Sequence, residues 1–115
     1  MKIRLFIMMV AFVISHTVDA ASQISMDKTI IELHTYTTGV SLKYSPVSSS
    51  AYGCSGASAT YTVHIDWTTD PDLKLLYSAA LAAYAAGKKV GFGVDGCLAG
   101  YGGDVPKVYR LDVSN

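Results

Sequence analysis

Clustered positive charge is the first thing that this sequence lacks. Charged residues make up only 16% of its 115 positions, and the only adjacent basic pair is Lys88-Lys89. Neutralising a phosphate backbone requires clustered Lys and Arg side chains. We therefore expect no nucleic-acid partner.

Motifs for catalysis, cofactors and metals are also missing. The chain has no Gly-x-Ser-x-Gly motif, and its glycine-rich segment at 100–104 matches neither a phosphate-binding loop nor a dinucleotide fingerprint. The aspartates do not follow the spacing of a calcium loop. We therefore expect a protein that is not an enzyme and that holds no cofactor and no metal.

One catalytic alternative stays open. His64 and Asp66 are two positions apart on a predicted strand, so their side chains share a face and the carboxylate can orient the imidazole. The other interpretation of this pair is an ordinary solvated strand face. A small hydrolase that uses His64 and Asp66 is therefore the third functional hypothesis.

Long hydrophobic runs are limited to the N-terminus. The basic residues Lys2 and Arg4 precede an apolar run at 5–14, and small residues before and at Ala20 suit a signal peptidase. This run is too short for a membrane span, which needs about 20 residues. We therefore expect a signal peptide at 1–20 and export to the periplasm or the medium, with no membrane attachment after cleavage.

Cysteine is scarce, with only Cys54 and Cys97 in the predicted mature domain at 21–115. Domains of this size have small cores and often carry a covalent link in oxidising compartments. An even cysteine count behind an export signal favours one disulfide. The alternatives are a reactive thiol and a metal site, and for a metal no His or carboxylate ligands stand nearby in a recognisable spacing. We therefore expect a single disulfide-linked domain.

Alternating apolar and polar residues predict several short strands. The clearest pattern is at 59–67, where Val63 and Ile65 take one face and Thr62 and His64 take the other. The predicted strands are 29–36, 40–44, 59–67, 90–94 and 107–113, and the first two are also compatible with one long bent strand.

A helix is predicted at about 71–86, between the third and fourth strands. Asp70 and Pro71 are typical of a helix start, and Gly87 is typical of a helix end. The predicted apolar face consists of Leu73, Leu76, Tyr77, Ala80, Leu81 and Tyr84. This order predicts an α+β domain: a small curled antiparallel sheet of four to five strands, closed as an OB-like barrel and packed with one helix.

The opposite face of this helix is small and nearly uncharged. Its residues include Leu75, Ala79, Ala82, Ala83 and Ala86. Alanine is the best helix former, which explains this composition without any partner. The alternative is a helix buried on two sides, and these five residues are then the predicted oligomer interface.

Aromatic side chains are the remaining candidates for ligand contact. Tyrosine combines an apolar ring with a hydroxyl group, which suits binding to sugars or proteins. Of the eight tyrosines, Tyr36, Tyr52 and Tyr101 have no evident place in the predicted core. Ordinary strand composition is the other interpretation of this tyrosine content.

The helix region resembles a known family. The segments Asp72-Leu73-Lys74-Leu75-Leu76-Tyr77, Ala80-Leu81, Ala83-Tyr84 and Ala86-Gly87-Lys88-Lys89-Val90 resemble the binding subunits of pertussis-like and subtilase-cytotoxin-like bacterial toxins. The resemblance covers about residues 60–94. It implies a secreted OB fold, a ring-shaped pentamer around a pore lined by the helix, and binding to cell-surface glycans that are often sialylated. The family's sugar-contacting region does not align with 21–58, so no glycan-binding residue carries over.

Two further hypotheses therefore stand beside the hydrolase. The first is an exported, non-catalytic binding module that forms a homo-oligomer like the toxin subunits and binds glycan. The second is a monomeric periplasmic inhibitor or protein-interaction domain.

Overall fold

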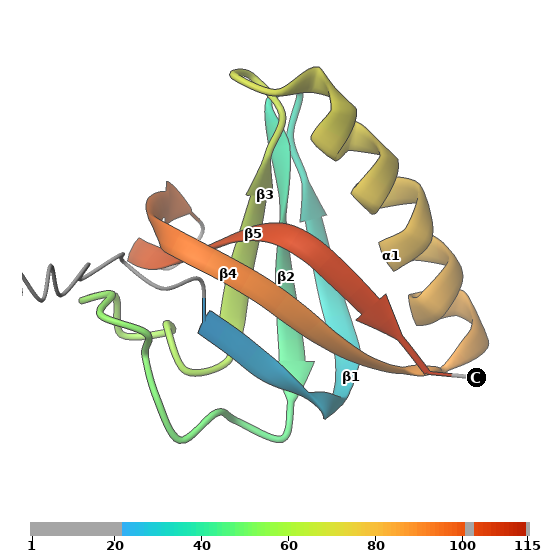
Figure 1. Cartoon of the computed structure of the whole chain (residues 1–115), viewed down its shortest axis with the longest axis horizontal. Coiled ribbons are helices and arrows are strands. Elements are labelled where there is room, and N and C mark those ends of the chain that lie inside the picture. The colour runs from blue at the N-terminus through green and yellow to red at the C-terminus, as the bar shows by residue number, and fades with distance from the viewer. Residues whose placement is uncertain (1–21, 101–102, 115) are drawn as a thin grey trace, which may run out of the picture.

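The computed structural model describes residues 22–100 and 103–114, so the predicted signal peptide at 1–20 and Tyr101 lie outside the described residues. The described elements are β1 (Ser22–Thr35), β2 (Gly39–Ser45), β3 (Thr62–Asp66), the 3₁₀ turn η1 (Pro71–Leu73), α1 (Lys74–Ala86), β4 (Lys89–Gly100) and β5 (Gly103–Val113). The strands form a closed barrel in the order β1-β2-β3-β5-β4, and α1 runs along one side of it (Figure 1). The predicted α+β class with an OB-like barrel is confirmed.

The long, bent strand β1 closes the barrel by pairing with two neighbours. Its first part pairs with β4, with Ile24 opposite Phe92, and its second part pairs with β2, with Leu33 opposite Leu42. Between Ile24 and Lys28, β1 bulges over Gly91, where a Cβ would lie 2.8 Å from the Ile24 carbonyl oxygen. A glycine at this position therefore lets the two strands approach closely.

The sheet is mixed, whereas an antiparallel sheet was predicted. β3 and β5 run parallel where they meet, at His64 and Lys107. The connection through α1 carries the chain across the barrel before β4, so β5 returns beside β3 in the same direction. Short-range patterns cannot reveal this pairing because it joins residues far apart in the sequence.

β4 is longer than predicted, because it continues through the segment around Cys97 to Gly100. Its register against β5 shifts between Gly93 and Val94 and again between Val94 and Cys97. The shifts accommodate Gly96, whose φ of 73° favours glycine. β3 is shorter than predicted, because it begins at Thr62 rather than at residue 59.

The core fills the barrel around Tyr44. The Tyr44 ring centroid lies 5.6 Å from that of Phe92, and its hydroxyl group is hydrogen-bonded to the Ser48 hydroxyl at 2.9 Å. Burial raises the pKa of Tyr44 to about 12. The buried apolar residues around it include Ile24, Ile30, Val40, Leu42, Val63, Ile65, Val90, Phe92 and Val108.

The predicted bounds of the helix are confirmed, and local chemistry explains both ends. The Asp70 carboxylate accepts a hydrogen bond from the Asp72 backbone N–H at 3.1 Å, and Pro71 follows the cap directly. At the other end, Gly87 adopts a left-handed φ of 63° and donates its N–H to the last turn.

The buried face of the helix agrees with the predicted one at Leu73, Leu76, Tyr77 and Ala80, which pack against the core, and differs from it at three other positions. Ala80 and Ala83 are buried in the core, while Leu81 and Tyr84 remain 40% and 45% exposed. The assignment of Ala83 to the outer interface face was therefore wrong, as was that of Leu81 and Tyr84 to the core. Small side chains at the centre of the contact let α1 lie close to the barrel, and this pushes the larger neighbours to the edges.

Replacing Ala83 by Leu tests this placement against its neighbour. Ala83→Leu adds methylene groups to a filled core, so we expect it to lower the free energy of unfolding by about 1–3 kcal/mol. Ala82→Leu is the matched control, because Ala82 is exposed on the same helix, and we expect a change within about 0.5 kcal/mol. Chemical denaturation of both variants measures the difference, and equal effects would contradict the burial of Ala83.

The predicted disulfide is confirmed. Cys54 and Cys97 are bonded with an S–S distance of 2.02 Å, which ties the long connection between β2 and β3 to strand β4. The same connection is also held by two backbone hydrogen bonds, from Ser48 N–H to the Thr60 carbonyl at 2.6 Å and from Gly56 N–H to the Asp104 carbonyl at 2.9 Å.

Candidate functional site

The predicted ligand-contacting tyrosines lie at different ends of the barrel. Tyr36 is in the turn between β1 and β2 and is 42% exposed. Tyr52 lies in the connection at the other end of β2, where it packs against the core and donates its hydroxyl hydrogen to the Gln23 carbonyl at 3.2 Å. Only part of Tyr52 is therefore accessible, and the structure does not bring the two rings together.

Polar residues beside Tyr36 form a row across three strands, in which three residues are half-buried and three are buried. Cross-strand pairing places His34 opposite Ser41 and Ser41 opposite His64, and it places Lys43 between Glu32 and Thr62. Because their sequence neighbours Leu33, Leu42, Val63 and Ile65 point toward the core, these side chains lie on the opposite face of the sheet. The outer strip is defined here as Glu32, His34, Ser41, Lys43, Thr62 and His64.

The centre of the outer strip is a buried hydrogen-bonded pair. The Ser41 hydroxyl lies 2.7 Å from Nδ1 of His64, and the two residues are only 0% and 7% exposed. Gly39 makes room for this ring, because a Cβ at that position would lie 2.8 Å from the His64 Nε2. The Tyr36 ring centroid is 6.3 Å from the imidazole. The pair therefore gives the strip one fixed point next to an exposed aromatic ring.

Asp66 does not orient His64 through a hydrogen bond to the ring. Its carboxylate instead accepts hydrogen bonds from the backbone N–H and the hydroxyl group of Thr68, at 2.8 and 2.5 Å. These bonds lower the pKa of Asp66, with a smaller contribution from His64. The hydroxyl beside the imidazole belongs to Ser41, which is fully buried and out of reach of a substrate.

Burial lowers the pKa of His64 below its usual value, and the nearby charge of Asp66 opposes this shift. The folded protein therefore binds fewer protons at this site than the unfolded chain as the pH falls below about 6.5. We expect stability to be unaffected by His64 above that pH and to decrease below it.

Denaturant titrations at pH 7.5 and 5.5 measure this dependence. His64→Gln keeps a hydrogen-bonding side chain but cannot titrate, so it should flatten the loss of stability over this interval. His34→Gln is the control on the same strip. An unchanged pH dependence in His64→Gln would show that another group causes it.

The half-exposed part of the outer strip carries opposite charges. Glu32 contacts the His34 ring through one carboxylate oxygen and lies 3.5 Å from the Lys43 ammonium through the other. The hydrogen bond from His34, followed by the charge of Lys43, lowers the pKa of Glu32 although burial opposes them. A carboxylate, an imidazole and an ammonium group are thus held together at the surface.

Thr62 adds an unsatisfied group to the strip. Among the described residues, its hydroxyl oxygen is the buried side-chain polar atom that lacks a hydrogen-bond partner. Such a group costs about 1–3 kcal/mol, and native proteins contain few of them.

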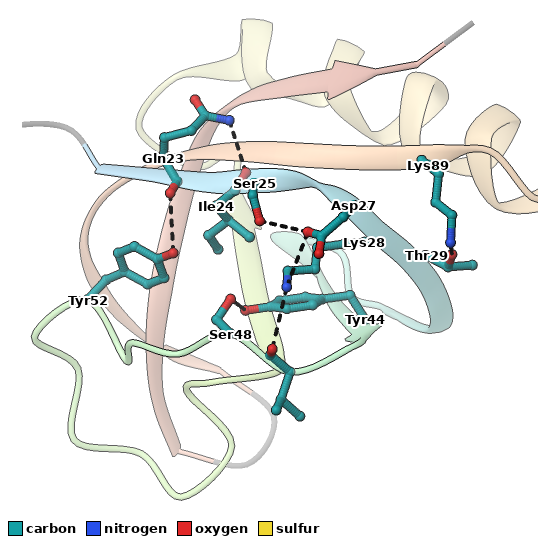
Figure 2. A network of polar contacts seen from close by, with 11 residues as sticks. Gln23, Ile24, Ser25, Asp27, Lys28, Thr29, Tyr44, Ser48, Tyr52 and Lys89 are labelled. Carbon is teal, nitrogen blue, oxygen red and sulfur yellow. Dashed lines mark hydrogen bonds and ion pairs between the residues drawn. The ribbon is translucent and has the colours of Figure 1, made fainter.

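A second polar cluster lies around Lys28, and Figure 2 shows that it links β1 to the connection after β2. The Lys28 ammonium lies 3.3 Å from the Asp27 carboxylate and 3.4 Å from the Val47 carbonyl, and Lys28 is only 4% exposed. The hydrogen bond from Ser25 is the main cause that lowers the pKa of Asp27, and Lys28 contributes to the same effect. These contacts hold the bulge of β1 in place.

The exposed face of α1 keeps the uncharged character that its sequence indicated. Leu75 is 74% exposed, and Ala79, Ala82 and Ala86 are exposed beside it.

Within the described part of the chain, no helix is long and apolar enough to cross a membrane.

Comparison with protein-family models, curated proteins and solved structures finds no match to this chain.

Sequence analysis singled out Tyr36 and His64, which the structure places near each other, but it did not connect Ser41, Lys43 and Thr62 with them. Each of them sits on the polar side of an alternating strand, which indicates a solvated face. The missing information was the register, because only strand pairing brings Ser41 beside His64 and Lys43 beside Thr62.

Proposed function

We propose that the protein is an exported, non-catalytic binding module that holds a glycan beside Tyr36, against the half-buried Glu32, His34 and Lys43 of the outer strip. OB folds bind oligosaccharides on the face of their second and third strands and on the loop between the first two strands. The outer strip lies on β2 and β3 together with the adjoining part of β1, and Tyr36 occupies the loop between β1 and β2. The exposed Tyr36 ring next to this strip is the observation that carries the proposal.

The chemistry of these side chains suits a sugar. A tyrosine ring stacks on the C–H groups of a pyranose, and its hydroxyl group remains available for hydrogen bonding. Glu32 supplies acceptors, while His34 and Lys43 supply donors for the sugar hydroxyls. Because Ser41 holds His64 in place at 2.7 Å, the ring beside Tyr36 does not need to be ordered on binding.

A glycan array followed by affinity measurements tests the proposal. Tyr36→Ala should weaken binding of any glycan that the wild-type protein retains by about tenfold or more. Tyr109→Ala is the matched control, because Tyr109 is 39% exposed on β5, outside the outer strip, and should leave affinity unchanged. Equal affinity of the Tyr36 variant and the wild type would place the ligand elsewhere. Absence of glycan binding would favour the monomeric protein-interaction alternative.

The proposal includes self-association through α1. From Leu75 to Ala86 the helix carries no charged residue, which suits close packing against another copy. The family resemblance implies a ring of five. Native mass spectrometry of the oxidised protein measures the number of copies. Five copies would support the ring. A monomer would contradict self-association and favour an inhibitor or protein-interaction domain.

Export is part of the same proposal. The Cys54–Cys97 disulfide supports it, because such bonds persist in oxidising compartments.

A further inference from the structure

Oxygen atoms surround the Cys54–Cys97 disulfide. A carboxylate oxygen of Asp104 and the two sulfur atoms all lie within 4.8 Å of one another. The carbonyl oxygens of Tyr52 and Gly96 lie 3.9 and 3.8 Å from the Cys54 sulfur. An oxidised sulfur has no hydrogen to donate, so these oxygens present only negative charge and the negative ends of dipoles to it.

The Asp104 carboxylate is held in this position by its neighbours. It faces the backbone N–H and the hydroxyl group of Ser55 at 3.4 and 3.5 Å. The backbone carbonyl of Asp104 also accepts the hydrogen bond from Gly56 at 2.9 Å. The carboxylate therefore stays beside the disulfide.

We propose that Asp104 shields this disulfide from thiol–disulfide exchange, most strongly against anionic thiols. Cys54 is only 6% exposed and Cys97 is half-buried, so an external thiolate reaches the Cys97 sulfur first. The attack forms a bond between the thiolate and Cys97, and the bond to Cys54 breaks. The electron pair leaves on the Cys54 sulfur, which then takes a proton from water.

Both charged sulfurs of this step lie in an unfavourable environment. The incoming thiolate approaches the Asp104 carboxylate, and the leaving charge develops on Cys54 beside two carbonyl oxygens. A second external thiolate must then attack the external sulfur of the mixed disulfide; the electron pair leaves on the Cys97 sulfur, which takes a proton from water, and the oxidised external thiol is released, which completes the two-electron reduction. Asp104 opposes that approach as well. The inference is independent of the glycan proposal, since it concerns only the bond that holds the fold.

Exchange kinetics with two thiols of opposite charge test the shielding. The oxidised protein is treated with 2-mercaptoethanesulfonate or with 2-aminoethanethiol at equal thiolate concentration and low ionic strength, then alkylated and weighed by mass spectrometry. For the wild type we expect faster reduction by the cationic thiol. Asp104→Asn keeps an oxygen acceptor for Ser55 and should lower the ratio of the two rates by about fivefold or more, because the lost carboxylate charge acts in opposite directions on the sulfonate of one thiol and the ammonium group of the other.

Asp72→Asn is the matched control, because it removes one exposed carboxylate from η1 and should leave the ratio unchanged. The salt dependence of the wild type provides a test without any substitution, since 0.5 M salt should reduce the same ratio by screening. The proposal is overturned if Asp104→Asn keeps the wild-type ratio, or if the wild-type ratio does not respond to salt.

Discussion

Replacing both Cys54 and Cys97 by Ala is expected to lower the free energy of unfolding by about 2–4 kcal/mol. The two cysteines are 43 residues apart, and a closed loop of this length restricts the unfolded chain by roughly 4 kcal/mol in the chain-entropy model. Alanine avoids placing a hydroxyl group at the buried Cys54 position. Because a small domain has little stability to spare, a loss of this size leaves much of the population unfolded on modest heating.

Urea denaturation of the oxidised protein and of the double variant measures this effect. Reduced wild-type protein is the control, and it should match the variant because both lack the same link. A difference below about 1 kcal/mol would contradict the prediction. It would mean that hydrogen bonds such as Gly56 to Asp104 and Ser48 to Thr60 hold the connection almost unaided.

Gly39→Ala is expected to be comparably damaging, with a loss of roughly 3 kcal/mol or more. A Cβ at this position would lie 2.2 Å from the Ile65 carbonyl oxygen and 2.8 Å from the His64 Nε2. Neither a strand backbone nor a buried ring that is hydrogen-bonded to Ser41 can move away easily. Alanine normally stabilises the folded state relative to glycine by about 0.5–1 kcal/mol. A net loss of stability would therefore be caused by the steric clash of the added Cβ.

Thr38→Ala is the matched control, because it changes an exposed residue in the same turn and should alter stability by no more than about 0.5 kcal/mol. Denaturation of both variants gives the comparison. If Gly39→Ala is as stable as the wild type, β2 and β3 do not approach each other as described. If it is unstable, any ligand affinity of the outer strip should fall with it, because His64 is displaced.

Local rules account for the features that the sequence predicted correctly. Asp70, Pro71 and Gly87 bound the helix because capping depends on residues within one turn of the chain. The disulfide was predicted from the even cysteine count behind a predicted export signal. Alternation located strands such as β2, since side chains on a strand point to opposite faces whatever their partners are.

Side-chain size against the barrel decided which face of the helix is buried. Periodicity placed Leu81 and Tyr84 in the core with Ala80 because they are apolar, but Ala83 is buried beside Ala80 in their place. A hydrophobic pattern shows which side of a helix faces the core. It does not show how closely the helix approaches the barrel, because that distance depends on the volumes of the packed side chains.

The chain by itself determined the α+β class, the helix bounds and the cysteine pairing, because each depends on neighbouring residues or on composition. Only the tertiary structure decided the parallel meeting of β3 with β5, the burial of Ala83 and the assembly of the outer strip. These features depend on the register between distant strands, and a shift of one residue would turn His64 and Ser41 to the other face. Register is set by how the whole barrel closes, and no short segment contains that information.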